Sequence, residues 1–264
     1  MENYVIPDLM DLDLMHLAKG NRYFCLANFY VKDEKYRAFF LNLKKYHPEA
    51  FITLDCGSAE KDTVTMTEYI DVTAELMPNE VLALDILFDK KATLDSFYEF
   101  IRKLDNHPKR LLNKVNIFAC PQGSNKEEYL ECYETMVRHP LVKTIGLSKI
   151  AVPKAFLNKT GDEGIKEARH ICINELTKLN LLLKPIHFLG MGDPTEFEYY
   201  KTLNNPLLRS TDSCYTVLAG KNNILFDEGN FTRIKTTNDF YHQKLSNEER
   251  ERAIRNIEWF KKHL

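Results

Sequence analysis

The sequence lacks the cysteine patterns of a disulfide-stapled or zinc-binding protein. Its six cysteines form no Cys-x-x-Cys pair and no regular framework, and no histidine stands at ligand spacing from Cys56, Cys120 or Cys214. We therefore expect reduced thiols, as in a cytoplasmic protein, and no bound metal or other cofactor.

Long hydrophobic runs are also missing. No stretch of 18 apolar residues occurs, and the start, MENYVIPDLMDLDLMHL, is acidic where a secretory signal would be basic and then apolar. The sequence therefore predicts a soluble protein with neither a membrane span nor a signal peptide.

Neither sign of charge is in large excess. Lys and Arg number 36, Asp and Glu 38, and the formal net charge is −2. Such a chain has no global attraction for a polyanion, so a nucleic-acid partner would have to be held by a local basic patch. Arg233 and Lys235 are the best phosphate candidates, because the cations of the tail alternate with glutamates.

What the sequence does contain is a series of short apolar runs without alternation. Runs of this kind are typical of strands buried on both faces, as in a parallel sheet covered by helices. Eight of them lie at residues 22–29, 51–55, 81–85, 114–120, 143–147, 184–190, 207–212 and 222–227.

Stretches with apolar residues every three or four positions follow most of these runs, as in residues 33–47, 93–107 and 125–139. Eight strands alternating with helices predict an α/β fold, a single (β/α)₈ TIM barrel over residues 1–264. At the tail, Ser246 and Glu249 form a capping box ahead of a predicted C-terminal closing helix.

Polar residues stand at the ends of several predicted strands, where a barrel of this kind carries its chemistry. The polar ends are Asp55, Asp85, Gln122 and Asp212, and the glycine ends are Gly146 and Gly190 with Gly192. An aspartate after a strand can simply cap the next helix. Two carboxylates at one mouth, however, can divide the roles of nucleophile and general acid/base.

Thiols and a histidine near the same strand ends have simpler interpretations. Cys56, Cys120 and Cys214 are neighbours of candidate site residues, yet cysteine is also a common small buried hydrophobe. His187 is the one histidine inside a predicted strand, and we expect it to be a core histidine whose polar atoms are hydrogen-bonded.

Four motifs, in order, resemble those of the tRNA-guanine transglycosylase family. TLDCGSAE resembles its L-D-S-G-G-F-Q, ACPQGS its V-Q-G-G, FLGMGDPTEF its Y-L-M-G-V-G-x-P-E-D-L and STDSCY its F-D-C-V. Intervals of 67, 68 and 22 residues separate Asp55, Gln122, Gly190 and Asp212. The resemblance covers roughly residues 50 to 215.

This resemblance implies an exchange of guanine in nucleic acid for a 7-deazaguanine base through a covalent glycosyl-enzyme. Asp212 matches the nucleophile and Asp55 the general acid/base. The remaining matches are to base-binding positions: Gln122 for the base edge, Asp85 in preference to Asp89 for a second carboxylate, Gly146, and the turn Gly190, Met191 and Gly192.

Departures from the family pattern bear on the substrate. The sequence has no counterpart of the family's zinc ligands, and Ser58, Ala59 and Glu60 replace its Gly-Phe-Gln. The chain is also too short for the extra RNA-binding module, so DNA is the expected partner and tRNA the alternative. A homodimer is compatible with either partner. The other interpretations are a non-catalytic barrel that binds nucleic acid or a partner subunit, and a nucleosidase or glycosidase in which water replaces the incoming base.

Overall fold

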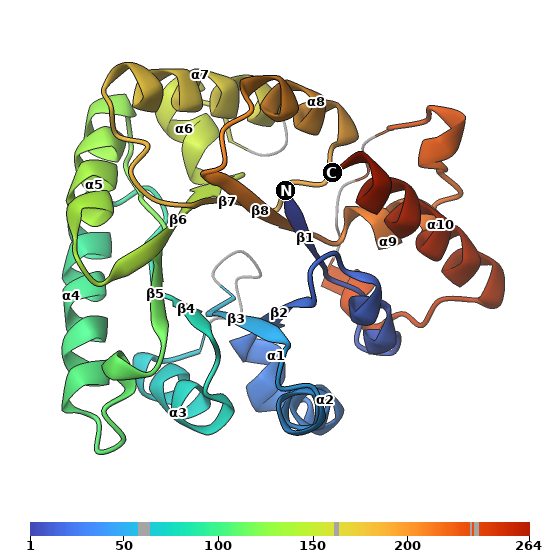
Figure 1. Ribbon diagram of the computed structural model, residues 1–264, viewed down its shortest axis with the longest axis horizontal. Helices are drawn as coiled ribbons and strands as arrows, with labels where there is room; N and C mark the ends of the chain where they lie inside the picture. Colours follow the sequence, from blue (N-terminus) through green and yellow to red (C-terminus); the bar gives the residue numbers. More distant parts are fainter. Residues whose placement is uncertain (58–63, 161–163, 233, 235–237) are drawn as a thin grey trace.

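The protein is a nearly closed barrel of eight parallel strands with alternating helices on the outside (Figure 1). The computed structural model describes residues 1–57, 64–160, 164–232, 234 and 238–264. The predicted (β/α)₈ fold class is thereby confirmed.

The strands are neighbours in the order β1-β8-β7-β6-β5-β4-β3-β2, and each neighbouring pair in this order is parallel. Their bounds are β1 (Glu2–Val5), β2 (Arg22–Leu26), β3 (Phe51–Asp55), β4 (Glu80–Leu82), β5 (Asn116–Ala119), β6 (Val142–Ser148), β7 (Ile186–Leu189) and β8 (Leu208–Ser213).

The helices form the outer ring, and most begin at a residue whose side chain accepts a hydrogen bond from the first turn, such as Asp33, Asp89 and Asn125. Their bounds are α1 (Ala27–Lys32), α2 (Glu34–Tyr46), α3 (Met66–Leu76), α4 (Lys90–Asn106), α5 (Lys126–Arg138), α6 (Ala151–Leu157), α7 (Ile165–Lys178), α8 (Pro194–Leu203), α9 (Tyr215–Lys221) and α10 (Asn247–His263), with 3₁₀ turns η1 (Leu12–Leu17), η3 (Leu111–Asn113), η4 (Phe226–Glu228) and η5 (Asn238–His242).

The first strand of the barrel is one that the sequence pattern does not predict. β1 is only four residues long, begins with Glu2 and includes the buried polar residue Asn3, so it has no apolar run. It nevertheless pairs in register with β8, with Glu2 opposite Ser210 and Val5 opposite Ser213. Backbone pairing and burial inside the sheet, and not local hydrophobicity, make this segment a strand.

The expected strand at 222–227 is wrong. This segment leaves α9 through Asn222 and Asn223 and then forms the 3₁₀ turn η4. Asn256 of α10 accepts a hydrogen bond from the backbone N–H of Phe226 (3.0 Å) and donates to the carbonyl of Ile224 (2.8 Å). A helix side chain therefore satisfies the backbone that a neighbouring strand would otherwise pair.

Side chains close the barrel between β1 and β2, where the hydrogen-bonded order ends. Arg22 lies 2.7 Å from Glu2 across this seam. Higher up, the rings of Tyr4 and Phe24 meet edge to face with centroids 5.6 Å apart. An ion pair and an aromatic pair thus replace the missing ladder of backbone hydrogen bonds.

The predicted closing helix is confirmed as α10, with both hydrogen bonds of the Ser246–Glu249 capping box. It packs on α9 at very close range, because a Cβ at Gly220 would lie 2.4 Å from the backbone nitrogen of Ala253. Only glycine permits this approach. The helix lies beside the N-terminal turn η1 as well, and Arg250 reaches Asp11 at 2.7 Å (Figure 1).

Across the described ranges, none of the helices combines the length and the apolar character needed to cross a lipid bilayer.

Asp8 is a buried carboxyl group in the loop between β1 and η1. The residue has no exposed surface, and its Oδ1 accepts a hydrogen bond from the N–H of Met10 at 2.8 Å. Within the described residues its Oδ2 has no hydrogen-bond partner. Burial raises the pKa of Asp8 to about 6, and the nearby Asp11 carboxylate adds to the increase.

The substitution Asp8→Asn is expected to raise the free energy of unfolding at pH 7 by about 1–2 kcal/mol. With a pKa of about 6 when folded and 3.8 when unfolded, the wild type loses stability as the pH rises through this interval. The amide of the variant does not titrate, so its advantage over the wild type should be larger at pH 7 than at pH 4. Urea unfolding at both values measures this difference.

The control is Asp71→Asn, which changes an exposed carboxylate on α3 and should leave the unfolding free energy nearly constant at both pH values. An Asp8→Asn variant that is less stable than the wild type at pH 7 would contradict the assignment of Asp8 as a buried carboxyl group whose ionisation destabilises the fold.

Candidate active site

A pocket lies at the carboxyl ends of the strands and collects side chains from opposite sides of the barrel. It holds about 720 Å³ of space between atoms, part of it open to solvent. Asp55, Asp85 and Asp212 all reach it, from β3, from the loop after β4 and from β8. The rest of the wall is mainly apolar, with a few polar groups: Ile6, Phe24, Leu26, Leu82, Leu87, Cys120, Ser148, Lys149, Ile150, Leu189, Gly190, Ser213, Cys214 and Tyr241.

Asp212 is held by two donors that act on the same oxygen. Its Oδ1 accepts hydrogen bonds from Nε2 of His187 and from the backbone N–H of Gly190, both at 2.9 Å. Asp212 is only 6% exposed, and it lines the pocket. Two donors therefore satisfy one oxygen of a carboxyl group that is almost completely buried.

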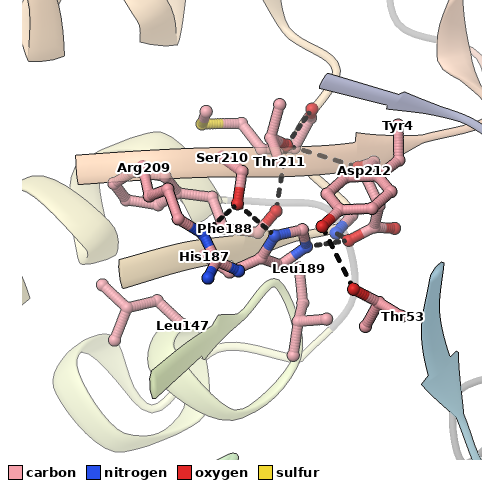
Figure 2. A network of polar contacts seen from close by, with 12 residues as sticks. Tyr4, Thr53, Leu147, His187, Phe188, Leu189, Arg209, Ser210, Thr211 and Asp212 are labelled. Atoms are coloured by element: carbon pink, nitrogen blue, oxygen red, sulfur yellow. Dashed lines mark hydrogen bonds and ion pairs between the residues drawn. The ribbon is translucent and has the colours of Figure 1, made fainter. Parts of the chain in front are cut away.

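His187 is completely buried in β7, and its burial lowers its pKa below the usual value in spite of the neighbouring Asp212 carboxylate. The imidazole is therefore neutral at pH 7. A carboxylate can only accept, so Nε2 carries the proton, and Nδ1 accepts from the hydroxyl of Ser210 at 2.9 Å. Figure 2 shows this arrangement of Ser210, His187 and Asp212.

The hydrogen-bonded chain continues downward from Ser210 into the barrel. Nε of Arg209 donates to the Ser210 hydroxyl at 3.1 Å, and the guanidinium then spans both carboxylate oxygens of Glu80 at 3.2 and 2.9 Å. Thr53 and Thr144 also donate to Glu80, which is 1% exposed. A buried ion pair at the base of the barrel is thus connected to the carboxylate at its mouth.

A β-bulge in β8 makes this chain possible. Ile186 of β7 pairs with Leu208, but the next residue, His187, pairs with Ser210, so Arg209 is an extra residue in the strand. In a regular strand Arg209 and Ser210 would point to opposite faces. The bulge lets both side chains take part in the interior network.

Asp85 and Gln122 form a second polar pair. Nε2 of Gln122 donates to Oδ2 of Asp85, and the backbone N–H of Phe88 donates to Oε1 of Gln122 at 3.1 Å. Gln122 has no exposed surface and is not part of the pocket wall, so it lies behind Asp85 and orients it. Asp89, the weaker candidate, accepts from the N–H of Ala92 and caps α4.

Asp55 ends β3 on the far side of the pocket from β7, and its Oδ1 accepts a hydrogen bond from the N–H of Gly57 at 3.2 Å. Gly57 has a φ of +80°, a conformation that favours glycine. This turn places the Asp55 carboxyl in the pocket wall.

The predicted glycine turn after β7 serves Asp212 directly. Gly190 has a φ of +67° and lines the pocket, and its N–H points at Oδ1 of Asp212. Met191 and Gly192 lie behind the wall; Met191 is 1% exposed and its carbonyl accepts from Thr211 at 2.7 Å. A Cβ at Gly192 would lie 2.2 Å from Oγ of Ser213.

Gly146 is a packing residue in β6 and is not part of the pocket wall. A Cβ there would lie 2.7 Å from Cδ1 of Leu189 and 2.8 Å from Cε2 of Phe118. Leu189 is part of the pocket wall. Gly146 therefore acts on the pocket through the position of Leu189.

Of the predicted phosphate contacts, Arg233 and Lys235 lie outside the described residues. Among the described residues, the cation that lines the pocket is Lys149, directly after β6. The sequence pattern does not distinguish Lys149 from the many other lysines of the chain.

Cys120 is disfavoured as a thiol nucleophile at this site. Cys120 lines the pocket, but burial and the negative charge of Asp85 raise its pKa well above the usual value, so the thiol stays protonated. No group of three or more metal-ligating side chains occurs in the part of the chain that was described. The three carboxyl groups of the pocket are therefore its main candidate reactive groups.

Comparison with known proteins gives no further guide to the chemistry. No protein-family model matches the chain, and no curated protein sequence matches it.

Proposed function

We propose that the protein is a base-exchange transglycosylase, which replaces guanine in DNA with a 7-deazaguanine derivative. The observation that carries the proposal is the shared pocket of Asp55 and Asp212, in which Oδ1 of Asp212 has two donors while Oδ2 has no hydrogen bond among the described residues. This leaves one carboxylate oxygen for attack on carbon.

In the first step Oδ2 of Asp212 attacks C1′ of the target nucleoside, and the bond between C1′ and the base breaks. The electron pair of that bond leaves with guanine, which receives a proton from Asp55. In the second step Asp55 takes the proton of the incoming 7-deazaguanine, whose nitrogen attacks C1′ and releases Asp212. Protons and electrons balance over the two steps, and Asp55 ends as it began.

The apolar part of the wall suits a flat purine ring, and Asp85 offers acceptor oxygens for the N–H groups on its edge. A guanine within a duplex cannot reach a pocket at a barrel mouth, so the target nucleotide would have to be flipped out or single-stranded. Lys149, on the same wall, is the described cation placed to meet a phosphate.

Denaturing gel electrophoresis tests the proposal. The protein is mixed with guanine-containing DNA or with tRNA, with and without a 7-deazaguanine base, and a covalent protein–nucleic acid band is expected with DNA. Release of free guanine without incorporation of the new base would identify a hydrolase. Binding without a band and without base release would identify a non-catalytic barrel.

The substitution Asp55→Asn is expected to lower base exchange by at least about 100-fold, since the departing base loses its proton donor. A covalent adduct should still be detectable on the gel, because Asp212 is intact and discharge of the adduct also needs Asp55. Asp95→Asn, an exposed aspartate on α4 paired with Lys91, is the matched control and should exchange at the wild-type rate. Normal turnover by Asp55→Asn would refute its role.

A further inference from the structure

His187 donates a hydrogen bond to Asp212, although it has no step of its own in the proposed reaction. It forms no part of the pocket wall and has no exposed surface, yet its Nε2 is one of the two donors to Asp212. The side chain thus acts on the pocket from behind the carboxylate.

We infer that His187 is a positioning residue, which selects Oδ2 of Asp212 as the attacking atom by holding Oδ1 with its Nε2–H. The inference rests on the proposed function. The ring is in turn oriented by Ser210, Arg209 and Glu80, so the structure assigns this buried chain to the reactivity of the carboxylate at the mouth.

Two hydrogen bonds on one oxygen make the two oxygens of Asp212 unequal. Oδ1 is engaged by Nε2–H of His187 and by the N–H of Gly190, which fixes the plane of the carboxylate. The negative charge available to a ligand is then presented by Oδ2 in a constant direction. Such preorganisation is worth most for a nucleophile, because a displacement of about 1 Å can cost about 100-fold in rate.

The orientation of the His187 imidazole is fixed by its aromatic neighbours and its two hydrogen bonds. The ring of Phe24 lies nearly parallel to it, at 9° and 5.8 Å, while Tyr4 and Phe118 meet its faces and edges, each with a centroid distance of 5.3 Å. Rotation by half a turn about the Cβ–Cγ bond would put carbon atoms where Nε2 and Nδ1 now lie, and so break the bonds to both Asp212 and Ser210. Packing and hydrogen bonding therefore favour one orientation.

The charged groups that face the ring support a neutral imidazole. Asp212 and Glu80 favour a proton on the ring, Arg209 opposes one, and complete burial opposes it most strongly. Tyr4, from β1, stays an uncharged phenol because burial raises its pKa to about 12. The ring donates from Nε2 and accepts at Nδ1, as the chain from Ser210 to Asp212 requires.

The test compares two variants at position 187. His187→Phe keeps an aromatic ring among Phe24, Tyr4 and Phe118 but removes the donor, and it should lower kcat for base exchange by about 100-fold with little change in KM. His187→Gln can place an amide N–H near the former Nε2 and should recover at least about tenfold of this loss. A merely structural role would change the stability of both variants but not this contrast in kcat.

A second pair of variants addresses the orientation of the ring. Ser210→Ala removes the partner of Nδ1 and is expected to lower kcat by about 5- to 10-fold. Thr73→Val is the matched control, because Thr73 is an equally buried hydroxyl, on α3, which donates to the carbonyl of Tyr69. It should exchange at the wild-type rate per folded molecule.

Nitrogen NMR of histidine-labelled protein gives a readout that does not depend on activity. Wild-type His187 should show a protonated Nε2 and an unprotonated Nδ1 at pH 7, with the signals assigned by their loss in His187→Gln. A doubly protonated ring, or a proton on Nδ1, would overturn the inference. If the wild type exchanges bases and His187→Phe has the same kcat, the inference is overturned and the proposed function stands. If the wild type does not exchange bases, the proposed function is removed, and the kinetic role of His187 with it.

Discussion

Replacement of Asp212 by alanine should abolish base exchange, with a loss of about 10³-fold or more in kcat, while the barrel stays folded. The carboxylate is the proposed nucleophile, and two donors hold its Oδ1 while Oδ2 faces the ligand. Single-turnover assays of base incorporation measure the loss, and circular dichroism reports the fold.

Asp212→Asn separates chemistry from packing. The alanine variant leaves Nε2–H of His187 and the N–H of Gly190 without an acceptor, at a cost of about 1–3 kcal/mol in stability. The asparagine variant keeps an acceptor oxygen for both, so it should be nearly as inactive as Asp212→Ala but more stable. Exchange and adduct formation at wild-type rates in either variant would remove the proposed nucleophile.

The second large effect concerns the base of the barrel. Glu80→Gln should lower the free energy of unfolding by about 3–5 kcal/mol, because it leaves the charge of Arg209 largely buried without its counter-ion. Glu80 is 1% exposed, and its carboxylate receives Arg209, Thr53 and Thr144. Urea denaturation at pH 7 gives the difference directly.

Two comparisons make this prediction specific. Asp95→Asn breaks an exposed ion pair with Lys91 on α4 and should cost less than about 0.5 kcal/mol. Glu80→Leu combined with Arg209→Met removes both charges and should recover a large part of the stability lost in Glu80→Gln. If Glu80→Gln behaves like the exposed control, the interior pair contributes little, and the network is held by other contacts.

The sequence predicts the barrel well wherever one local pattern determines one element. Runs such as 51–55 become strands because their residues are buried on both faces, and segments such as 125–139 become helices because one face is apolar and an N-cap is present. The capping box of α10 is also a local signal. These features depend only on residues a few positions apart.

The errors occur where distant residues decide the outcome. β1 becomes a strand through its pairing with β8, some 200 residues away. The segment 222–227 looks like a strand, yet Asn256 satisfies its backbone from α10. Neither partner is visible in the local sequence, so an analysis of periodicity misses the first strand of the barrel and predicts an extra strand at 222–227.

The same distinction applies to the site. Asp55, Asp85, Gly190 and Asp212 follow from their places at strand ends, and all four line the pocket. The roles of the residues behind them do not follow from the sequence. Glu80 and Arg209 meet across 129 positions, and the bulge that brings Arg209 beside Ser210 breaks the alternation on which strand predictions depend.

His187 marks the limit of the prediction. A core histidine with its polar atoms hydrogen-bonded is what the sequence predicts, and it is what the structure contains. The identity of the partner decides whether such a residue only fills space or also orients a reactive group. That identity depends on the register of β7 against β8.

The bulge in β8 also constrains how this barrel can diverge. Because it lets adjacent residues join one continuous polar column, positions 80, 187, 209, 210 and 212 cannot drift independently in descendants of the gene. A lineage that loses the carboxylate at the mouth would relieve selection on the histidine beneath it, whereas the charged pair at the base would persist for its own sake. Substitutions in these residues should therefore accumulate first at the mouth of the barrel and last at its base.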